Sequence, residues 1–144
     1  MDAASRDRVL FVLALFVGAS AWFGVSLFDA RREAWDSPLF WSWALPAAYG
    51  ACLALGYFGS RDAWRWPALV LGTLFACAAV SAGGGLSLWP LTLGLLGLMA
   101  AVGLLPTYIG VGLRRLSDAR RARRAAADAR LKAFLSETPP PPPA

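Results

Sequence analysis

The sequence predicts an all-α integral membrane protein: a bundle of four transmembrane helices, a basic cytoplasmic helix after it, and a disordered proline-rich tail. Apolar residues make up 58% of the 144-residue chain and charged residues only 16%, whereas a soluble domain carries charge on roughly a quarter of its residues. The apolar residues also gather in four blocks that contain no Asp, Glu, Lys or Arg. These blocks are residues 9–28, 39–58, 67–82 and 86–113.

The lengths of the blocks indicate helices that cross a bilayer. A helix rises 1.5 Å per residue, so about 20 apolar residues cross the hydrocarbon core. The first two blocks have this length, the third is short, and the fourth is longer. We therefore expect a cytoplasmic N-terminus over 1–8, a transmembrane domain over 9–113 with spans near 9–28, 39–58, 66–83 and 87–111, a basic helix over 114–137, and the tail over 138–144.

The segments between the blocks contain residues typical of helix ends and membrane edges. Ser37 and Pro38 have the form of an N-cap followed by proline at the first helical position. Three glycines at 83–85 predict a tight turn, after which Ser87 can cap the fourth helix. Six tryptophans lie near the expected membrane edges, as in an aromatic belt. Trp35, Trp41, Trp43 and Trp89 are near one edge, and Trp64 and Trp66 near the other.

The distribution of positive charge predicts the orientation. Four spans place both termini and the second connection on one side, together with twelve of the fourteen basic residues. Only Arg31 and Arg32 lie on the other side. Because Lys and Arg near the spans are retained in the cytoplasm during insertion, we expect a multi-pass protein of the inner membrane with both termini in the cytoplasm.

The first block also permits a second interpretation, a cleaved signal peptide. Arg6 and Arg8 precede the apolar run, and Ala19, Ser20 and Ala21 have the small-x-small form of a cleavage site. Cleavage would leave three spans and an N-terminus outside. Apolar residues continue to Phe28, however, which favours a retained span of full length.

Small residues recur at every fourth position of the middle spans and predict how the helices pack. Helices in lipid associate mainly through close packing, which small residues allow. We expect a contact between the second and third helices through these two stripes, with a similar role for Gly97 and Ala101 in the fourth. The stripes are Ala44, Ala48, Cys52 and Gly56, and Ala68, Gly72 and Ala76.

Prolines and hydroxyl groups inside the spans suggest a polar intramembrane face. Pro46 lacks an N–H and pushes against the carbonyl of Ser42, so a kink there would free a polar group near Tyr49. The candidate face comprises Ser42, Tyr49, Thr73 and Ser81. The simpler interpretation is a kink whose polar groups are satisfied by neighbouring helices. Pro106 is expected to mark the inner membrane edge and an angle between span and tail.

The segment after the last span combines positive charge with an alanine stripe about 120° wide on a helical wheel. Its basic residues are Arg114, Arg115, Arg120, Arg121, Arg123, Arg124, Arg130 and Lys132, and the stripe comprises Ala119, Ala122, Ala125, Ala126, Ala129 and Ala133. The preferred interpretation is contact with anionic lipid headgroups at the cytoplasmic face. The second is a docking helix for a protein partner or another copy. Nucleic-acid binding is disfavoured because no base-reading motif is present.

The residues that catalysis and ion coupling need are missing from the sequence. There is no His, and no carboxylate or basic residue lies inside the four expected spans, where coupled transporters place one. Cys52 and Cys77 lie at different depths, so neither a disulfide nor a metal site is expected, and no cofactor either. The sequence favours a non-enzymatic accessory or scaffold subunit of a membrane complex. The alternatives are an oligomeric transporter or channel for a neutral or lipid-like solute, and a holin-like membrane-lesion protein.

Overall fold

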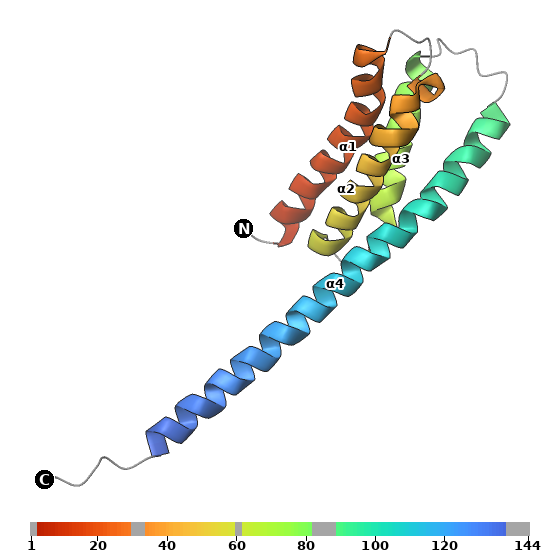
Figure 1. Ribbon diagram of the computed structural model, residues 1–144. Coiled ribbons are helices and arrows are strands. Elements are labelled where there is room, and N and C mark those ends of the chain that lie inside the picture. The colour runs from red at the N-terminus through yellow and green to blue at the C-terminus, as the bar shows by residue number, and fades with distance from the viewer. Residues whose placement is uncertain (1–2, 30–33, 60–61, 82–88, 138–144) are drawn as a thin grey trace, which may run out of the picture.

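The computed structural model describes residues 3–29, 34–59, 62–81 and 89–137, and their secondary structure is entirely helical, which confirms the all-α prediction. The long helices are α1 (Ala3–Phe28), α2 (Leu45–Phe58), α3 (Arg65–Ser81) and α4 (Trp89–Glu137), and η1 (Ala34–Asp36) and η2 (Phe40–Ala44) precede α2. The four helices run alternately in opposite directions (Figure 1). The start of α1 and the connection between α2 and α3 therefore lie at the same end of the bundle.

Two helical segments, Ala4–Phe28 and Leu93–Phe134, are long and apolar enough to cross a membrane. Only 28% and 22% of their most apolar stretches are buried inside the bundle. Large apolar side chains such as Phe16 and Leu105 are about two-thirds exposed, at 66% and 67%. An apolar core helix of a soluble protein is mostly buried, so this exposed apolar surface is compatible with a membrane location.

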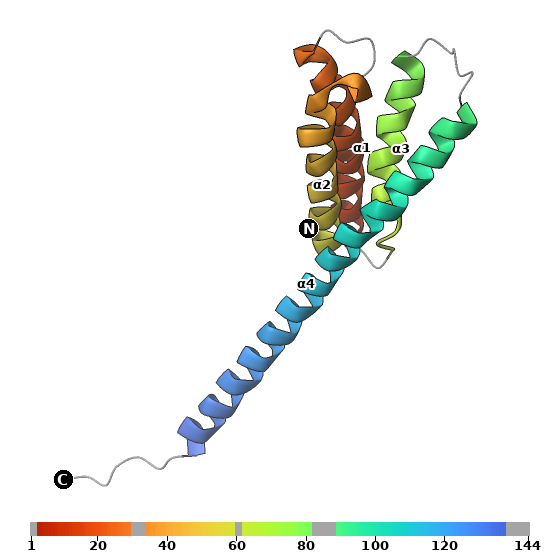
Figure 2. The ribbon, with the colours of Figure 1, turned by 45° about the vertical axis from the view of Figure 1, so that its right-hand side comes forward.

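Helix α4 is a single 49-residue helix that contains Pro106. At 1.5 Å per residue it is roughly 73 Å long, and its C-terminal half extends far beyond the other helices (Figures 1 and 2). The angle expected at Pro106 between span and tail is not found, because the apolar and basic parts form one continuous helix that runs on in one direction (Figures 1 and 2). The carbonyl that loses its helical donor at Pro106 is that of Val102. The hydroxyl of the next residue, Thr107, donates to the neighbouring carbonyl of Gly103 at 2.8 Å.

The helices pair differently from the sequence prediction. Helix α1 packs chiefly on α3, and α2 chiefly on α4, whereas α2 and α3 make a minor contact. The expected contact between the small-residue stripes of the second and third helices is therefore wrong. In α3, Ala68 and Ala76 are exposed, and a Cβ on Gly72 would meet nothing within 4 Å. Helix α3 instead turns its bulky side inward, including Val70 and Leu74.

Helices approach one another closely at three glycines. A Cβ on Gly18 of α1 would overlap the Val70 carbonyl of α3. Between α2 and α4, a Cβ on Gly56 would overlap the Thr107 carbonyl, and one on Gly110 would overlap the Leu53 carbonyl. The α2 stripe is thus buried as expected from Ala48 to Gly56. Ala48 and Cys52 share a core cluster with Ala14 of α1 and with Trp66 and Val70 of α3, so the stripe meets bulky side chains of α3 and not its small residues.

The packing face of α4 also differs from the prediction. Gly97 and Ala101 are exposed, and a Cβ on Gly97 would meet nothing within 4 Å. The buried small residues are instead Gly103, Thr107 and Gly110. Their spacing of four and three residues places them on one face of the helix.

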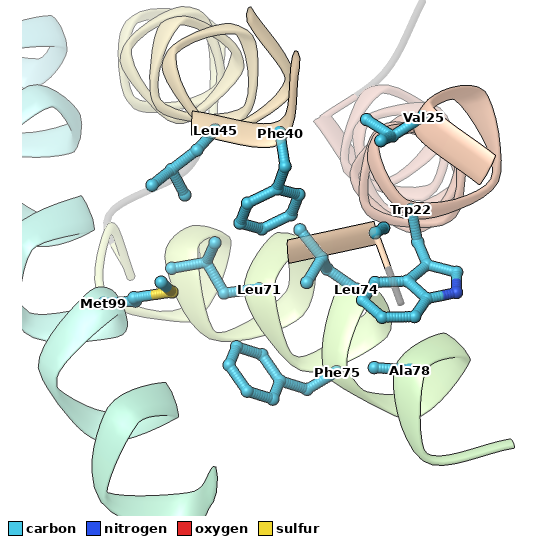
Figure 3. Close-up of a cluster of buried hydrophobic side chains, with 10 residues drawn as sticks. Trp22, Val25, Phe40, Leu45, Leu71, Leu74, Phe75, Ala78 and Met99 are labelled. Atoms are coloured by element: carbon cyan, nitrogen blue, oxygen red, sulfur yellow. The ribbon is translucent and has the colours of Figure 1, made fainter. Parts of the chain in front are cut away.

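A layer of large side chains fills the bundle interior. Leu71 and Leu74 of α3 lie at its centre, with Trp22 of α1, Phe40 of η2 and Met99 of α4 around them (Figure 3). The indole of Trp22 donates to the Ser81 hydroxyl at 3.0 Å, so α1 and α3 are joined by a hydrogen bond as well as by packing.

The predictions for helix-start and membrane-edge residues are confirmed in some places and wrong in others. The N-cap at Ser37 is confirmed, because the Leu39 N–H donates to its hydroxyl at 3.2 Å. Trp41, Trp43 and Trp64 are exposed as belt residues are, whereas Trp66 is fully buried and the prediction for it is wrong. The turn at 83–85, Ser87, the tail at 138–144 and the side chains of Trp35 and Trp89 lie outside the described residues.

The glycine contacts predict opposite effects for two matched substitutions. Gly18→Ala should lower the free energy of unfolding by about 1–3 kcal/mol, because the added methyl overlaps the Val70 carbonyl. Gly72→Ala should raise it by about 0.5 kcal/mol, because the site is open and alanine favours the helix. Thermal or denaturant unfolding in mild detergent measures both. If both variants changed the free energy of unfolding by the same amount, the described contacts of Gly18 and Gly72 would be wrong.

Candidate functional site

The four hydroxyl residues of the predicted polar face each donate to a backbone carbonyl. Ser42 donates to Pro38, Thr73 to Leu69 and Ser81 to Cys77, each at 2.8 Å, and Tyr49 donates to Met99 at 3.3 Å. Ser42 and Ser81 are exposed. Among the described residues no hydrogen bond joins any two of the four, so the structure does not assemble them into one polar site.

The irregularity expected at Pro46 takes the form of a π-helical turn. Residues Phe40–Ala44 form η2, and the Leu45 N–H donates to the Phe40 carbonyl five residues back. Pro46 lies at the start of α2, directly after η2. Ala44 and Leu45 have helical backbone angles, so the helix is continuous here, and the missing N–H of Pro46 leaves one carbonyl of the preceding turn without its helical donor. The wider π-helical turn is the local adjustment of the helix next to the proline.

An apolar groove lies between α1 and the η2–α2 segment and has a volume of about 660 Å³. Small residues form much of its lining, including Ser20 and Gly24 of α1 and Ala47 and Ala51 of α2. Phe16, Phe28 and Trp43 add aromatic rings. We refer to this hollow as the apolar groove.

The chemistry of the apolar groove is that of a hydrocarbon site. The Ser20 hydroxyl is the sole polar side-chain group in its lining apart from the Trp43 indole N–H, and no charged residue contributes. Within the described residues, no three His, Cys, Asp or Glu side chains come together as a metal site requires. The groove suits an acyl chain or an apolar helix face rather than a reacting polar substrate.

A set of polar contacts ties three segments together at the basic end of the bundle. The Arg65 guanidinium lies 3.6 Å from the Asp7 carboxylate of α1 and 3.5 Å from that of Asp62. Arg114 of α4 donates to the carbonyl of Gly59, which ends α2. We call these five residues the collar. It joins the start of α1, the α2–α3 connection and α4.

Beyond the collar, α4 continues as a solitary helix. All side chains from 118 to 134 are exposed, and we call this part the arm (residues 118–134). On a helical wheel of the arm, Arg123 and Arg130 border the alanine stripe on one edge, and Arg121 and Lys132 border it on the other. Arg114, by contrast, belongs to the collar, and Arg115 follows it directly in α4.

Sequence reasoning missed the apolar groove and the collar. The groove was detectable in part, because Ser20 with Gly24 and Ala47 with Ala51 are further small pairs at spacing four. The collar had no local signal, since Asp7 and Arg65 are far apart in the chain and meet only through folding.

No protein family model, no curated protein and no solved structure matches this chain.

Loss of the collar contact of α4 should destabilise the bundle modestly. Arg114→Gln removes the hydrogen bond to Gly59 and the 3.8 Å ion pair with Asp118. Because the side chain is 38% exposed, we expect a loss of about 1 kcal/mol in the free energy of unfolding. Arg120→Gln, at an exposed position of the same helix, is the control and should have little effect. Similar unfolding curves for both variants would refute the role of the collar.

Proposed function

We propose that this chain is a four-span inner-membrane protein with both termini in the cytoplasm, and that it is a non-enzymatic accessory or scaffold subunit whose arm presents a docking surface to a partner. The observation that carries the proposal is the continuity of α4, which runs without a break from an apolar segment into the exposed basic arm. One rigid helix thereby connects the membrane-embedded bundle to the cytoplasm.

The exposed surface of the two shorter helices supports four spans rather than two. Trp43 and Phe58 at the two ends of the η2–α2 segment are 74% and 57% exposed, and Val80 of α3 is 80% exposed. A soluble monomer rarely exposes contiguous apolar patches larger than a few hundred Å². Hydrocarbon around all four helices would cover this surface.

The contacts of α1 support its retention in the mature protein. Cleavage after Ala21 would remove Gly18, which lies directly against the α3 backbone, and Ala14, which is fully buried. It would also start the mature chain at Trp22, whose indole binds Ser81. A segment so deeply integrated in the core is more consistent with a first span than with a signal peptide.

The collar supports the proposed orientation. It gathers Arg65 and Arg114 at the bundle end from which the N-terminus and the arm also extend (Figure 1). Retention of basic residues on the cytoplasmic side would place this end in the cytoplasm. Basic residues that only determine the orientation of the protein in the membrane do not need to bind a ligand.

The geometry of the arm favours a cytoplasmic partner over lipid for the distal basic residues. Lys132 is eighteen residues beyond Arg114, roughly 27 Å along the helix axis. The attraction of anionic headgroups decays within a Debye length of about 8 Å at physiological ionic strength. Arg114 and Arg115 remain within reach of headgroups, whereas a straight arm carries Arg130 and Lys132 away from them.

The transport alternative has less support from the same geometry. The hydroxyls proposed to line a path, among them Ser42 and Thr73, already bond to carbonyls of their own helices. The apolar groove would admit only hydrocarbon. A scaffold role therefore explains more of the described surface.

Deletion of residues 117–144 tests the proposed function. We expect the shortened protein to insert and fold, because the collar and all contacts between helices up to Arg114 remain. Recovery of partner proteins by crosslinking and affinity purification from native membranes should be lost. A full-length protein that purifies without partners, or a deletion that retains all of them, would contradict the proposal.

A further inference from the structure

The apolar groove is a site for hydrocarbon that the bundle itself leaves open. We propose that it holds the acyl chain of a phospholipid from the outer leaflet of the membrane. This inference rests on the membrane location under the proposed function and assigns a ligand class to a second site, apart from the arm. The groove extends between α1 and the η2–α2 segment to the end of the bundle opposite the collar (Figure 1).

The groove exists because the helices associate in two pairs. Helix α1 packs chiefly on α3 and α2 chiefly on α4, so α1 and α2 make a less extensive contact with each other. Small residues on both sides of the groove leave space between these two helices, namely Ser20 and Gly24 of α1 and Ala47 and Ala51 of α2. A Cβ on Gly24 would meet nothing within 4 Å. The described side chains therefore do not fill this site.

The groove has the depth of about one membrane leaflet. Its lining runs from Phe28 to Phe16 in α1 and from Leu39 to Ala51 in the η2–α2 segment. In each case this is roughly 18 Å along a helix. One leaflet contributes about half of the ~30 Å thickness of the hydrocarbon core. An acyl chain that enters the groove beside Phe28 would therefore end near Phe16.

The inner end of the groove is closed by side-chain packing. Beyond it, Leu10 and Ala14 of α1 share a buried cluster with Cys52 and Leu55 of α2. A transmembrane helix of a partner or of a second copy crosses both leaflets, about 30 Å, and would extend well past the groove. A site that is closed near mid-depth instead matches a chain that ends within one leaflet.

The shape and chemistry of the groove also fit a flexible chain. Val25 and Ala48 are buried in its floor, whereas Phe16, Phe28 and Trp43 are exposed at its rim. Its volume of about 660 Å³ lies within the range of roughly 300–1,000 Å³ that is typical of small-molecule sites. No charged residue is among the described residues that line it. A chain of methylene groups would thus bury no charged side chain there.

Lipid is also the medium that surrounds the groove if all four helices span the membrane. An empty groove would lose the dispersion contacts of its lining atoms, and an apolar cavity does not attract water. A chain in the groove packs against α1 and α2 at once and so joins the two helix pairs. Because the chain only moves from one apolar environment to another, binding depends on close packing. A side chain that fills the groove should therefore displace it.

Two glycines provide a matched test. Gly24→Leu puts a side chain into the groove, whereas Gly97→Leu puts the same side chain on an exposed face of α4, and at both positions an added Cβ meets nothing within 4 Å. The full-length chains would be placed in phosphatidylcholine nanodiscs with a trace of phosphatidylcholine that carries a photoactivatable diazirine at the end of one acyl chain. Mass spectrometry of peptides then locates the label. This lipid has no net charge, so the basic residues do not attract it.

We expect the wild-type chain to be labelled at Val17 and Ala51, which lie at the inner end of the groove and are partly buried. Gly24→Leu should lower this labelling about tenfold, because leucine occupies the path of the chain. Gly97→Leu should change it less than about twofold. Labelling of Val102, an exposed residue of α4, should be the same in all three proteins.

A second variant keeps the test decisive if Gly24→Leu fails to fold. Ala47→Leu fills the groove from its other wall and should lower the labelling of Val17 and Ala51 in the same way. The proposal would be overturned if these two residues were unlabelled in the wild type, or if Gly24→Leu and Gly97→Leu were labelled equally there. A wild-type dimer in the nanodiscs that Gly24→Leu converts to a monomer would assign the groove to a second copy and would also overturn it.

The pattern of labels separates this inference from the proposed function. If Val102 is labelled but Val17 and Ala51 are not, the membrane location stands and the acyl-chain inference fails. If Ala54 of α2 and Ala76 of α3, which are exposed, escape the label while Val102 is labelled, the four-span proposal fails. If the groove is labelled but partner recovery survives deletion of residues 117–144, the scaffold role fails and the acyl-chain site stands.

Discussion

The bundle depends on the close approach of helix backbones at a few glycines. If all four helices lie within hydrocarbon, as we propose, there is little hydrophobic drive to bring them together, and their association relies on packing at short distance. Gly18 allows α1 to meet the backbone of α3, and Gly56 and Gly110 allow α2 and α4 to meet. Both pairs contribute to the layer around Leu71 and Leu74, which fills the space between them.

The same contacts determine where the arm begins and in which direction it extends. Gly103, Thr107 and Gly110 form the buried face of α4, and Arg114 is bonded to the carbonyl at the end of α2. Because α4 continues through Pro106 and beyond the collar without interruption, its packing inside the bundle sets the direction of the arm. The proposed docking surface is thus positioned by small residues far from it in the helix.

Sequence patterns predicted the all-helical fold, the N-cap at Ser37 and the gathering of basic residues at one end, because each depends on local composition or spacing. They did not predict the helix pairing. Small residues at spacing four occur on several faces, and the sequence alone does not reveal that Gly72 faces outward while bulky Val70 faces inward. The helix likewise continues through Pro106, where the proline by itself suggested an angle.

The central claim, that all four helices cross the membrane with the collar in the cytoplasm, is tested most directly by the accessibility of single cysteines. In a background with Cys52 and Cys77 replaced by serine, Arg32→Cys and Gly84→Cys should react with an impermeant maleimide in intact spheroplasts. Asp62→Cys and Glu137→Cys should react only after permeabilisation. If Asp62→Cys were labelled in intact spheroplasts, the connection between α2 and α3 would lie outside. These two helices would then not cross the membrane, which would contradict the account.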